Sequence, residues 1–136
     1  MIGSASGIQS FDHFVSALFS GAPSDSHTAG HGPTSYPAEL DDLYFLYGVV
    51  RRSCAVSVLE FGSGWSTLAI ALAICENRAA MSGSYSARHP NPFKVLSIEA
   101  DVDWAATTTA RLQGCVREVA KVHLSAVRIS KWAGQS

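Results

Sequence analysis

The sequence predicts an α/β fold built on a mainly parallel sheet. Two short apolar segments each end in a glutamate, each is followed by a segment with helical features, and a third apolar segment closes the series. Such alternation of strands and helices is typical of a parallel sheet with right-handed crossovers. The 136 residues, 47% of them apolar, suffice for one domain. We divide them into an N-terminal helical segment with a loop, 1–54, and an α/β part, 55–136.

Two helices are expected before the first strand. The apolar-rich segment 11–19 predicts a short helix, and Gly, Pro, Ser and Thr dominate 21–37, which predicts a loop. Pro37 suits the first turn of the next helix, AELDDLYFLYGVVRRS, in which apolar residues recur at helical spacing. Acidic residues near its start and Arg51 and Arg52 at its end complement the helix dipole.

The first strand is expected at 55–61, AVSVLEF. Its apolar character is nearly continuous rather than alternating, which indicates a strand covered on both faces, as in a parallel sheet. Ser66 and Thr67 can cap the helix that follows. This helix is apolar almost all round up to about Asn77, so we expect it to be well buried, with a loop at 78–92.

The second strand is expected at 94–98, KVLSI, and Glu99 closes it. Asp101 can cap a third helix, which should end near Gly114 because glycine is common just after a helix. A final strand is expected near 122–129.

Charge and apolar run length exclude several classes of protein. The formal net charge is −1 without a cluster of Lys and Arg, which argues against nucleic acid or an anionic membrane as the main partner. The longest apolar run, Leu68 to Cys75, is too short to span a bilayer, and the N-terminus lacks the features of a secretory signal. Cys54, Cys75 and Cys115 lie in or beside apolar segments without C-x-x-C spacing, which favours buried, reduced thiols and a cytoplasmic location.

The turn after the first strand carries the most informative pattern. Glu60 ends the strand, and Gly62 and Gly64 follow before the next helix begins. A strand that ends in a glycine turn and opens a helix forms a corner that binds anions or nucleotides. Glycines allow ligand atoms to approach the backbone where a Cβ atom would collide.

Spacing separates the known motifs that share this layout. A P-loop would need Gly-Lys-Ser/Thr, and the turn contains no lysine. A G-x-S-x-G elbow would need glycines at Phe61 and Trp65, and the third glycine of the dinucleotide pattern G-x-G-x-x-G falls on Thr67. The pattern that remains is acidic-x-Gly-x-Gly.

This pattern resembles motif I of the class I S-adenosylmethionine-dependent methyltransferases. The resemblance implies a Rossmann-like three-layer sandwich in which the acidic residue, here Glu60, helps hold the amino-acid part of the cofactor, directly or through water. The ammonium and sulfonium groups of S-adenosylmethionine are cationic, so a carboxylate suits them, whereas it would repel the pyrophosphate of NAD. Ser66 replaces a third glycine common in motif I, a mild departure.

The second strand extends the resemblance. The C-terminal end of such a strand faces the ligand crevice, so Glu99 looks like the acceptor of both ribose hydroxyls, with Ala100 or Asp101 near the adenine. Trp65 either covers the cofactor or packs inside the protein. The resemblance implies a cofactor site formed by Glu60, Phe61, Gly62, Ser63, Gly64, Trp65, Ser66, Thr67, Glu99 and Ala100. We expect no bound metal, because His27 and His31, although four residues apart, lie in a segment rich in Gly and Pro.

The resemblance is partial. Sheets of that family have seven strands in the order 3-2-1-4-5-7-6, and the sequence offers three. We therefore expect 55–136 to be a partial S-adenosylmethionine-binding domain, truncated after the third strand, and the chain alone to be inactive. The open edge of its first strand could support self-association.

Three functions follow, without assigned catalytic residues. The favoured one is the cofactor-binding half of an S-adenosylmethionine-dependent methyltransferase that acts on an unidentified small molecule or protein. A non-catalytic, truncated or degenerate cofactor-binding module is the alternative. A fragment of an NAD(P)-dependent oxidoreductase is less favoured, although Glu99 would suit its ribose equally well.

Overall fold

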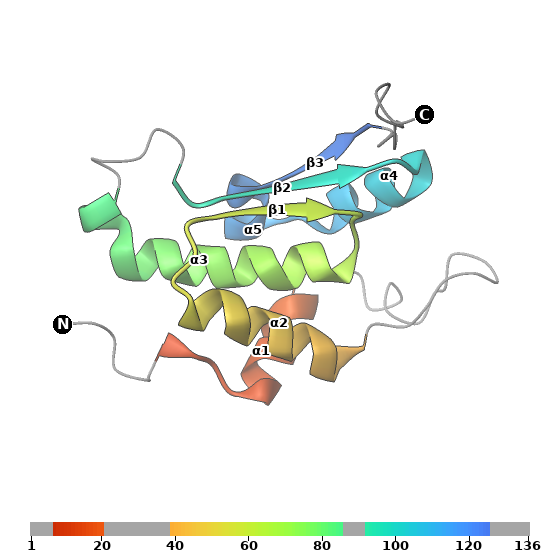
Figure 1. The fold of residues 1–136 in the computed structure, drawn as a ribbon. Helices are drawn as coiled ribbons and strands as arrows, with labels where there is room; N and C mark the ends of the chain where they lie inside the picture. The colour runs from red at the N-terminus through yellow and green to blue at the C-terminus, as the bar shows by residue number, and fades with distance from the viewer. Residues whose placement is uncertain (1–6, 21–38, 86–91, 126–136) are drawn as a thin grey trace, which may run out of the picture.

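The fold is an α/β arrangement around an open parallel sheet (Figure 1). The structure is a computed structural model that describes residues 7–20, 39–85 and 92–125. Its three parallel strands are adjacent in sequence order: β1 (Ser57–Phe61), β2 (Lys94–Glu99) and β3 (Ala120–Leu124). The predicted α/β class is therefore confirmed, and β1 lies at an edge of the described sheet.

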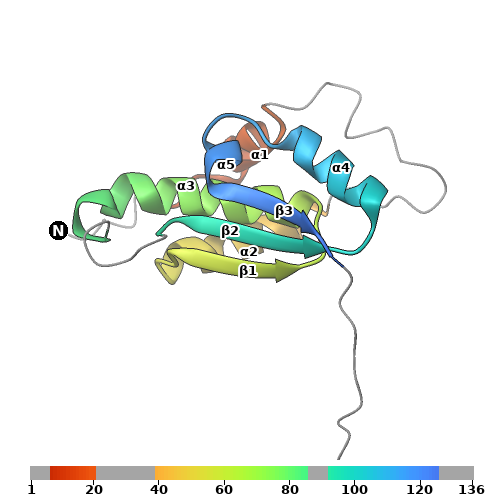
Figure 2. The same ribbon diagram turned by 90° about the horizontal axis from the view of Figure 1, so that it is seen from above.

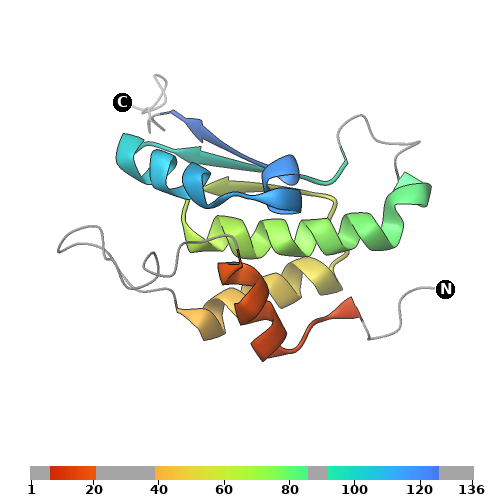
Figure 3. The same ribbon diagram turned by 180° about the vertical axis from the view of Figure 1, so that it is seen from behind.

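The described helices all lie on one side of this sheet (Figures 1, 2 and 3). Helix α3 runs beneath the sheet, and α4 and α5 lie next to α3 on the same side of the sheet (Figure 3). Helices α1 and α2 pack on the side of α3 that faces away from the strands (Figure 3). The helices are α1 (Phe11–Phe19), α2 (Leu40–Arg52), α3 (Trp65–Tyr85), α4 (Val102–Arg111) and α5 (Gly114–Val119).

The opposite face of the sheet is bare among the described residues. Leu59, Phe61 and Leu96 point to that side, and their exposed fractions are 58%, 70% and 39%. The expectation that the first strand is covered on both faces is therefore wrong for the described part of the chain. A continuous apolar run shows that both faces can be buried, but it does not supply the second cover.

Two helix boundaries differ from the prediction. Helix α3 continues to Tyr85, past the polar residue Asn77, because that side chain is fully buried and hydrogen-bonded rather than marking an end. Helix α4 ends at Arg111, and Gly114, at φ +60°, begins the separate helix α5 instead of closing a longer helix.

Helix α3 begins at Trp65, so Ser66 and Thr67 lie in its first turn and not at the predicted cap position. The other predicted elements agree with the structure where it describes them. The helices at 11–19 and in AELDDLYFLYGVVRRS are confirmed as α1 and α2, and the strands at 55–61 and 94–98 as β1 and β2. The final strand begins slightly earlier than predicted. Three predicted segments lie outside the described residues: the loop at 21–37, residues 86–91 of the loop predicted at 78–92, and the part of the final predicted strand after residue 125.

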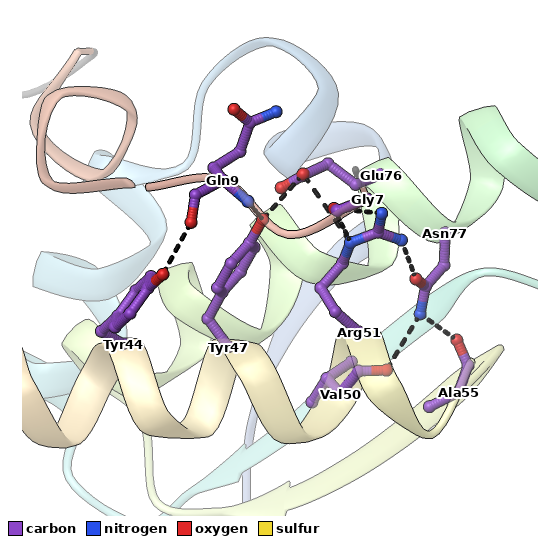
Figure 4. Close-up of polar contacts among 9 residues, drawn as sticks. All are labelled: Gly7, Gln9, Tyr44, Tyr47, Val50, Arg51, Ala55, Glu76 and Asn77. Atoms are coloured by element: carbon purple, nitrogen blue, oxygen red, sulfur yellow. Dashed lines mark hydrogen bonds and ion pairs between the residues drawn. The ribbon is translucent and has the colours of Figure 1, made fainter. Parts of the chain in front are cut away.

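Asn77 joins the end of α2 to the start of β1 (Figure 4). Its Nδ2 donates hydrogen bonds to the carbonyl oxygens of Val50 (3.2 Å) and Ala55 (2.8 Å), and its Oδ1 accepts one from Arg51. Arg51 also donates from Nε to the carbonyl of Gly7 (2.8 Å). A buried amide thus satisfies backbone carbonyls at the helix end, which fixes where the chain turns into the sheet.

Tyr47 extends this network toward the N-terminal segment (Figure 4). Its hydroxyl donates to Glu76 (2.7 Å) and accepts from the backbone N–H of Gln9 (3.1 Å). Burial is the main cause that raises the pKa of Tyr47 to about 12, so the phenol stays protonated at neutral pH. The segment before α1 is therefore fastened to both α2 and α3.

The cysteines correct a further prediction. Cys75 on α3 and Cys115 on α5 form a disulfide with a Cα–Cα distance of 6.2 Å, and Cys54 is free and exposed. The expectation of buried, reduced thiols is therefore wrong. Spacing in the sequence did not reveal the pair because 40 residues separate its members.

The disulfide should contribute measurably to stability. Replacing both Cys75 and Cys115 with serine is expected to lower the free energy of unfolding by about 2–4 kcal/mol, because the unfolded chain loses a constraint. Urea unfolding under non-reducing conditions measures this difference. A Cys54→Ser variant is the control and should unfold like the wild type. Equal stability of the double variant and the wild type would contradict the expected contribution.

Candidate functional site

The candidate site lies at the carboxyl ends of β1 and β2, which are parallel and finish at the same end of the sheet. The turn after β1 passes next to the end of β2, and the backbone N–H of Gly62 donates to the carbonyl of Ile98 (2.8 Å). Gly62 has φ +89°, a conformation that side-chain-bearing residues rarely adopt. Apart from the adjacent residues of the chain, no atom of the described residues lies within 4 Å of where a Cβ atom would stand at Gly62 or Gly64, so the turn borders open space in the described part of the chain.

Glu60 braces the turn from its inner side. Its carboxylate accepts hydrogen bonds from the hydroxyls of Ser66 (2.5 Å), Thr67 (2.5 Å) and Ser97 (2.6 Å). Thr67 and Ser97 are fully buried. The carboxylate therefore holds the first turn of α3 against β2, and three hydroxyl groups occupy it in the structure.

Thr67 links the Glu60 carboxylate to the glycine turn. Its hydroxyl accepts from the backbone N–H of Gly64 (3.1 Å), and its own N–H donates to the Gly64 carbonyl (3.1 Å). The residue that breaks the G-x-G-x-x-G pattern thus shapes the turn. A glycine at this position would lack the hydroxyl that links Gly64 to Glu60.

Glu99 bridges the two chain segments that follow β1 and β2. Its Oε1 accepts from the N–H (2.9 Å) and the hydroxyl (2.7 Å) of Ser63, and its Oε2 accepts from the N–H groups of Ala100 (3.0 Å) and Asp101 (3.2 Å). Asp101 in turn caps α4 by accepting from the N–H of Trp104 (2.9 Å). The predicted strand-end carboxylate therefore lies directly beside the glycine turn.

The surroundings of Glu99 keep it ionised. Burial of the carboxyl group raises its pKa, but the hydrogen bonds from Ser63, Asp101 and Ala100 together lower it by more, so the pKa lies below the ordinary 4.5. Hydrogen bonds to a carboxylate favour its charged form. At neutral pH the site thus presents an anionic acceptor near the surface.

The structure brings most of the predicted site residues together, but two lie apart from this polar cluster. Trp65 is partly buried and packs against the core: the Arg111 guanidinium lies 4.1 Å from its ring centroid, and the Phe19 ring makes an edge contact at 4.9 Å between centroids. Of the two roles left open for Trp65, the structure thus supports packing. Phe61 lies on the bare face of the sheet, with its side chain 70% exposed.

Two hydroxyl residues of the site were missed in the sequence. Ser97 lies directly opposite Glu60 in the register of β1 and β2, and two residues before Glu99 on the same face of its strand. Thr108 on α4 is fully buried and donates to the Ser63 hydroxyl (3.2 Å). The alternation of strand side chains was a signal for Ser97, whereas only the packing of α4 reveals Thr108.

Comparisons with known proteins leave the family open. Neither a scan against protein-family models nor a search of the curated proteins found a match for this chain. Within the described residues, no helix has both the length and the apolar character needed to cross a membrane.

Proposed function

We propose that the chain binds S-adenosylmethionine at the glycine turn, as the cofactor-binding part of a methyltransferase. The observation that carries this proposal is the ionised Glu99 carboxylate, held at the end of β2 within hydrogen-bonding distance of the turn at Ser63. A carboxylate in this place can accept a hydrogen bond from a ribose hydroxyl in exchange for one of its present donors.

The strand order also supports the proposal. Read from the far edge, the described sheet has the order β3-β2-β1, which corresponds to the first three positions of the 3-2-1-4-5-7-6 order of the class I methyltransferases. The edge of β1 at which the next strand of that order would pair is free of strands among the described residues. The methyl acceptor and the catalytic groups are not assigned.

The hydrogen bonds of Glu60 support the alternative function, a non-catalytic cofactor-binding module. Its carboxylate, proposed to hold the amino-acid part of the cofactor, is engaged by three hydroxyls on the inner side of the turn. A module that retains the ribose contact at Glu99 but lacks a ligand contact at Glu60 would bind the adenosine part without supporting chemistry. An NAD(P)-dependent oxidoreductase fragment remains the less favoured reading.

Calorimetric titration of the folded chain with S-adenosylhomocysteine and, separately, with NAD tests the proposal. Saturable binding of S-adenosylhomocysteine without binding of NAD is the expected result, because the turn provides no cation for a pyrophosphate. Binding of adenosine with the same affinity as S-adenosylhomocysteine would favour the non-catalytic module. Binding of NAD alone would overturn the proposal in favour of an oxidoreductase.

Location and association are part of the proposal. The exposed, free thiol of Cys54 suits a reducing cytoplasm, whereas the Cys75–Cys115 disulfide is more typical of oxidising compartments. We propose the cytoplasm, with small-molecule ligands rather than nucleic acid or membranes as partners. Self-association through the free edge of β1 is also proposed, and sedimentation velocity over a range of concentrations would detect it.

A further inference from the structure

The Glu99 carboxylate is fully engaged by groups of the protein. Each of its oxygens accepts two hydrogen bonds, at distances of 2.7 and 2.9 Å for Oε1 and 3.0 and 3.2 Å for Oε2. A carboxylate offers about four acceptor positions in total. A ribose hydroxyl would bring one more donor, so one of the present hydrogen bonds must give way for each ribose hydroxyl that binds.

Only one of the four present donors can move without moving the backbone. The N–H groups of Ala100 and Asp101 belong to the segment that opens α4, and the N–H of Ser63 belongs to the glycine turn, which Gly62 ties to β2. The fourth donor is the Ser63 hydroxyl, which rotates about χ1. Side-chain rotation of this kind is fast and requires no change in the fold.

A second oxygen lies within reach of this hydroxyl. Thr108 Oγ1 is 3.2 Å from Ser63 Oγ and donates a hydrogen bond to it in the structure. If Ser63 releases Glu99, the direction of this hydrogen bond can reverse, because each hydroxyl is both a donor and an acceptor. Thr108 thus provides an alternative partner at a buried position.

We propose that the Ser63 hydroxyl occupies the acceptor position of Glu99 that a ribose hydroxyl takes, so a ribose-containing ligand must displace it. This inference rests on the proposed function and concerns the regulation of affinity at the same site. Ser63 acts as a positioning residue in this scheme. It holds the carboxylate against the turn and competes with the ligand for one of its oxygens.

Removal of the competing hydroxyl should strengthen binding of a diol. For Ser63→Ala, the dissociation constant of adenosine is expected to fall about tenfold, which is the order expected for one hydrogen bond to a charged group. The affinity for 2′,3′-dideoxyadenosine should not rise, because this ligand donates no hydroxyl to Glu99. A merely structural role of Ser63 would change the affinity for both nucleosides alike.

Calorimetric titrations of the full chain with adenosine, 2′,3′-dideoxyadenosine and S-adenosylhomocysteine test this inference. The variants are Ser63→Ala and, as a matched control, Thr109→Ala, which removes a hydroxyl from an exposed position of α4. If the wild type binds S-adenosylhomocysteine and Ser63→Ala shows no gain for adenosine, or an equal gain for both nucleosides, the inference fails while the proposed function stands. If the folded wild type binds none of these ligands, both fail.

A measurement without ligand checks the hydrogen bond itself. The Ser63 side chain contributes the largest of the hydrogen-bond effects that lower the pKa of Glu99. Carbon-13 NMR titration should therefore show a higher pKa for the Glu99 carboxyl in Ser63→Ala than in the wild type. An unchanged pKa would show that the hydroxyl does not engage Glu99 in solution and would overturn the inference.

Discussion

A Glu99→Ala variant is expected to bind S-adenosylhomocysteine at least about tenfold more weakly than the wild type, since a hydrogen bond from a ribose hydroxyl to a charged acceptor contributes about 1.5–3 kcal/mol. The loss is large because Glu99 is the carboxylate that lies at the end of β2 and beside the glycine turn. Calorimetric dissociation constants of the two proteins give the ratio directly.

The matched control for this comparison is Asp103→Ala, which removes an exposed carboxylate from the first turn of α4. Its affinity should remain within about twofold of the wild type, as expected for a screened surface charge. Circular dichroism of each variant verifies that the fold persists. Equal affinities of folded Glu99→Ala and wild type would contradict the role assigned to Glu99.

The lowered pKa of Glu99 also determines how this contribution depends on pH. A carboxyl group whose pKa is lower in the folded state stabilises that state above its unfolded pKa, and this contribution is lost as the pH falls through the folded value. Ligand binding through the carboxylate should weaken over the same pH range, as Glu99 becomes protonated. Affinity should therefore persist to a lower pH than an ordinary carboxyl of pKa 4.5 would allow.

Glu60→Ala is expected to lower the free energy of unfolding by about 4 kcal/mol. The change removes the common acceptor of the Ser66, Thr67 and Ser97 hydroxyls, two of which are fully buried. A buried donor that loses its partner costs about 1–3 kcal/mol, and partial rearrangement of Ser66 toward water offsets part of the sum. Urea denaturation followed by circular dichroism measures the effect.

Glu118→Ala serves as the control for Glu60→Ala. Glu118 pairs with Arg78 at 2.8 Å on the surface, where such ion pairs contribute about 0–1 kcal/mol. If Glu60→Ala unfolds at the same urea concentration as the control, the carboxylate does not brace the turn. A large loss of ligand affinity without a loss of stability would instead favour a direct ligand role for Glu60.

Much of the fold was predictable because local signals and long-range packing agree. The acidic start and basic end of α2 complement the helix dipole. The glutamates Glu60 and Glu99 lie near the carboxyl ends of β1 and β2, which meet at the same end of the parallel sheet. The position of Glu99 beside the glycine turn was predictable for the same reason. The end of a parallel strand fixes the position of its last side chain relative to the neighbouring turn.

Other features depend on contacts that a single sequence does not display. Glu60 was predicted to face the ligand, yet the side-chain alternation of β1 turns it toward α3 and Ser97. Trp65 packs under Arg111 because α4 ends beside it, a contact between residues 46 positions apart. The Cys75–Cys115 pair likewise depends on how α5 docks on α3.

The bare face of the sheet carries positive charge around its exposed apolar side chains. The register of the strands places Lys94 and Lys121 on this face, around the exposed Leu59 and Leu96, and no described strand residue on it is acidic. Two such faces pressed together would trap ammonium groups against one another without counterions, and each buried ion would cost several kcal/mol. The two lysines on this face thus disfavour the stacking of two like faces.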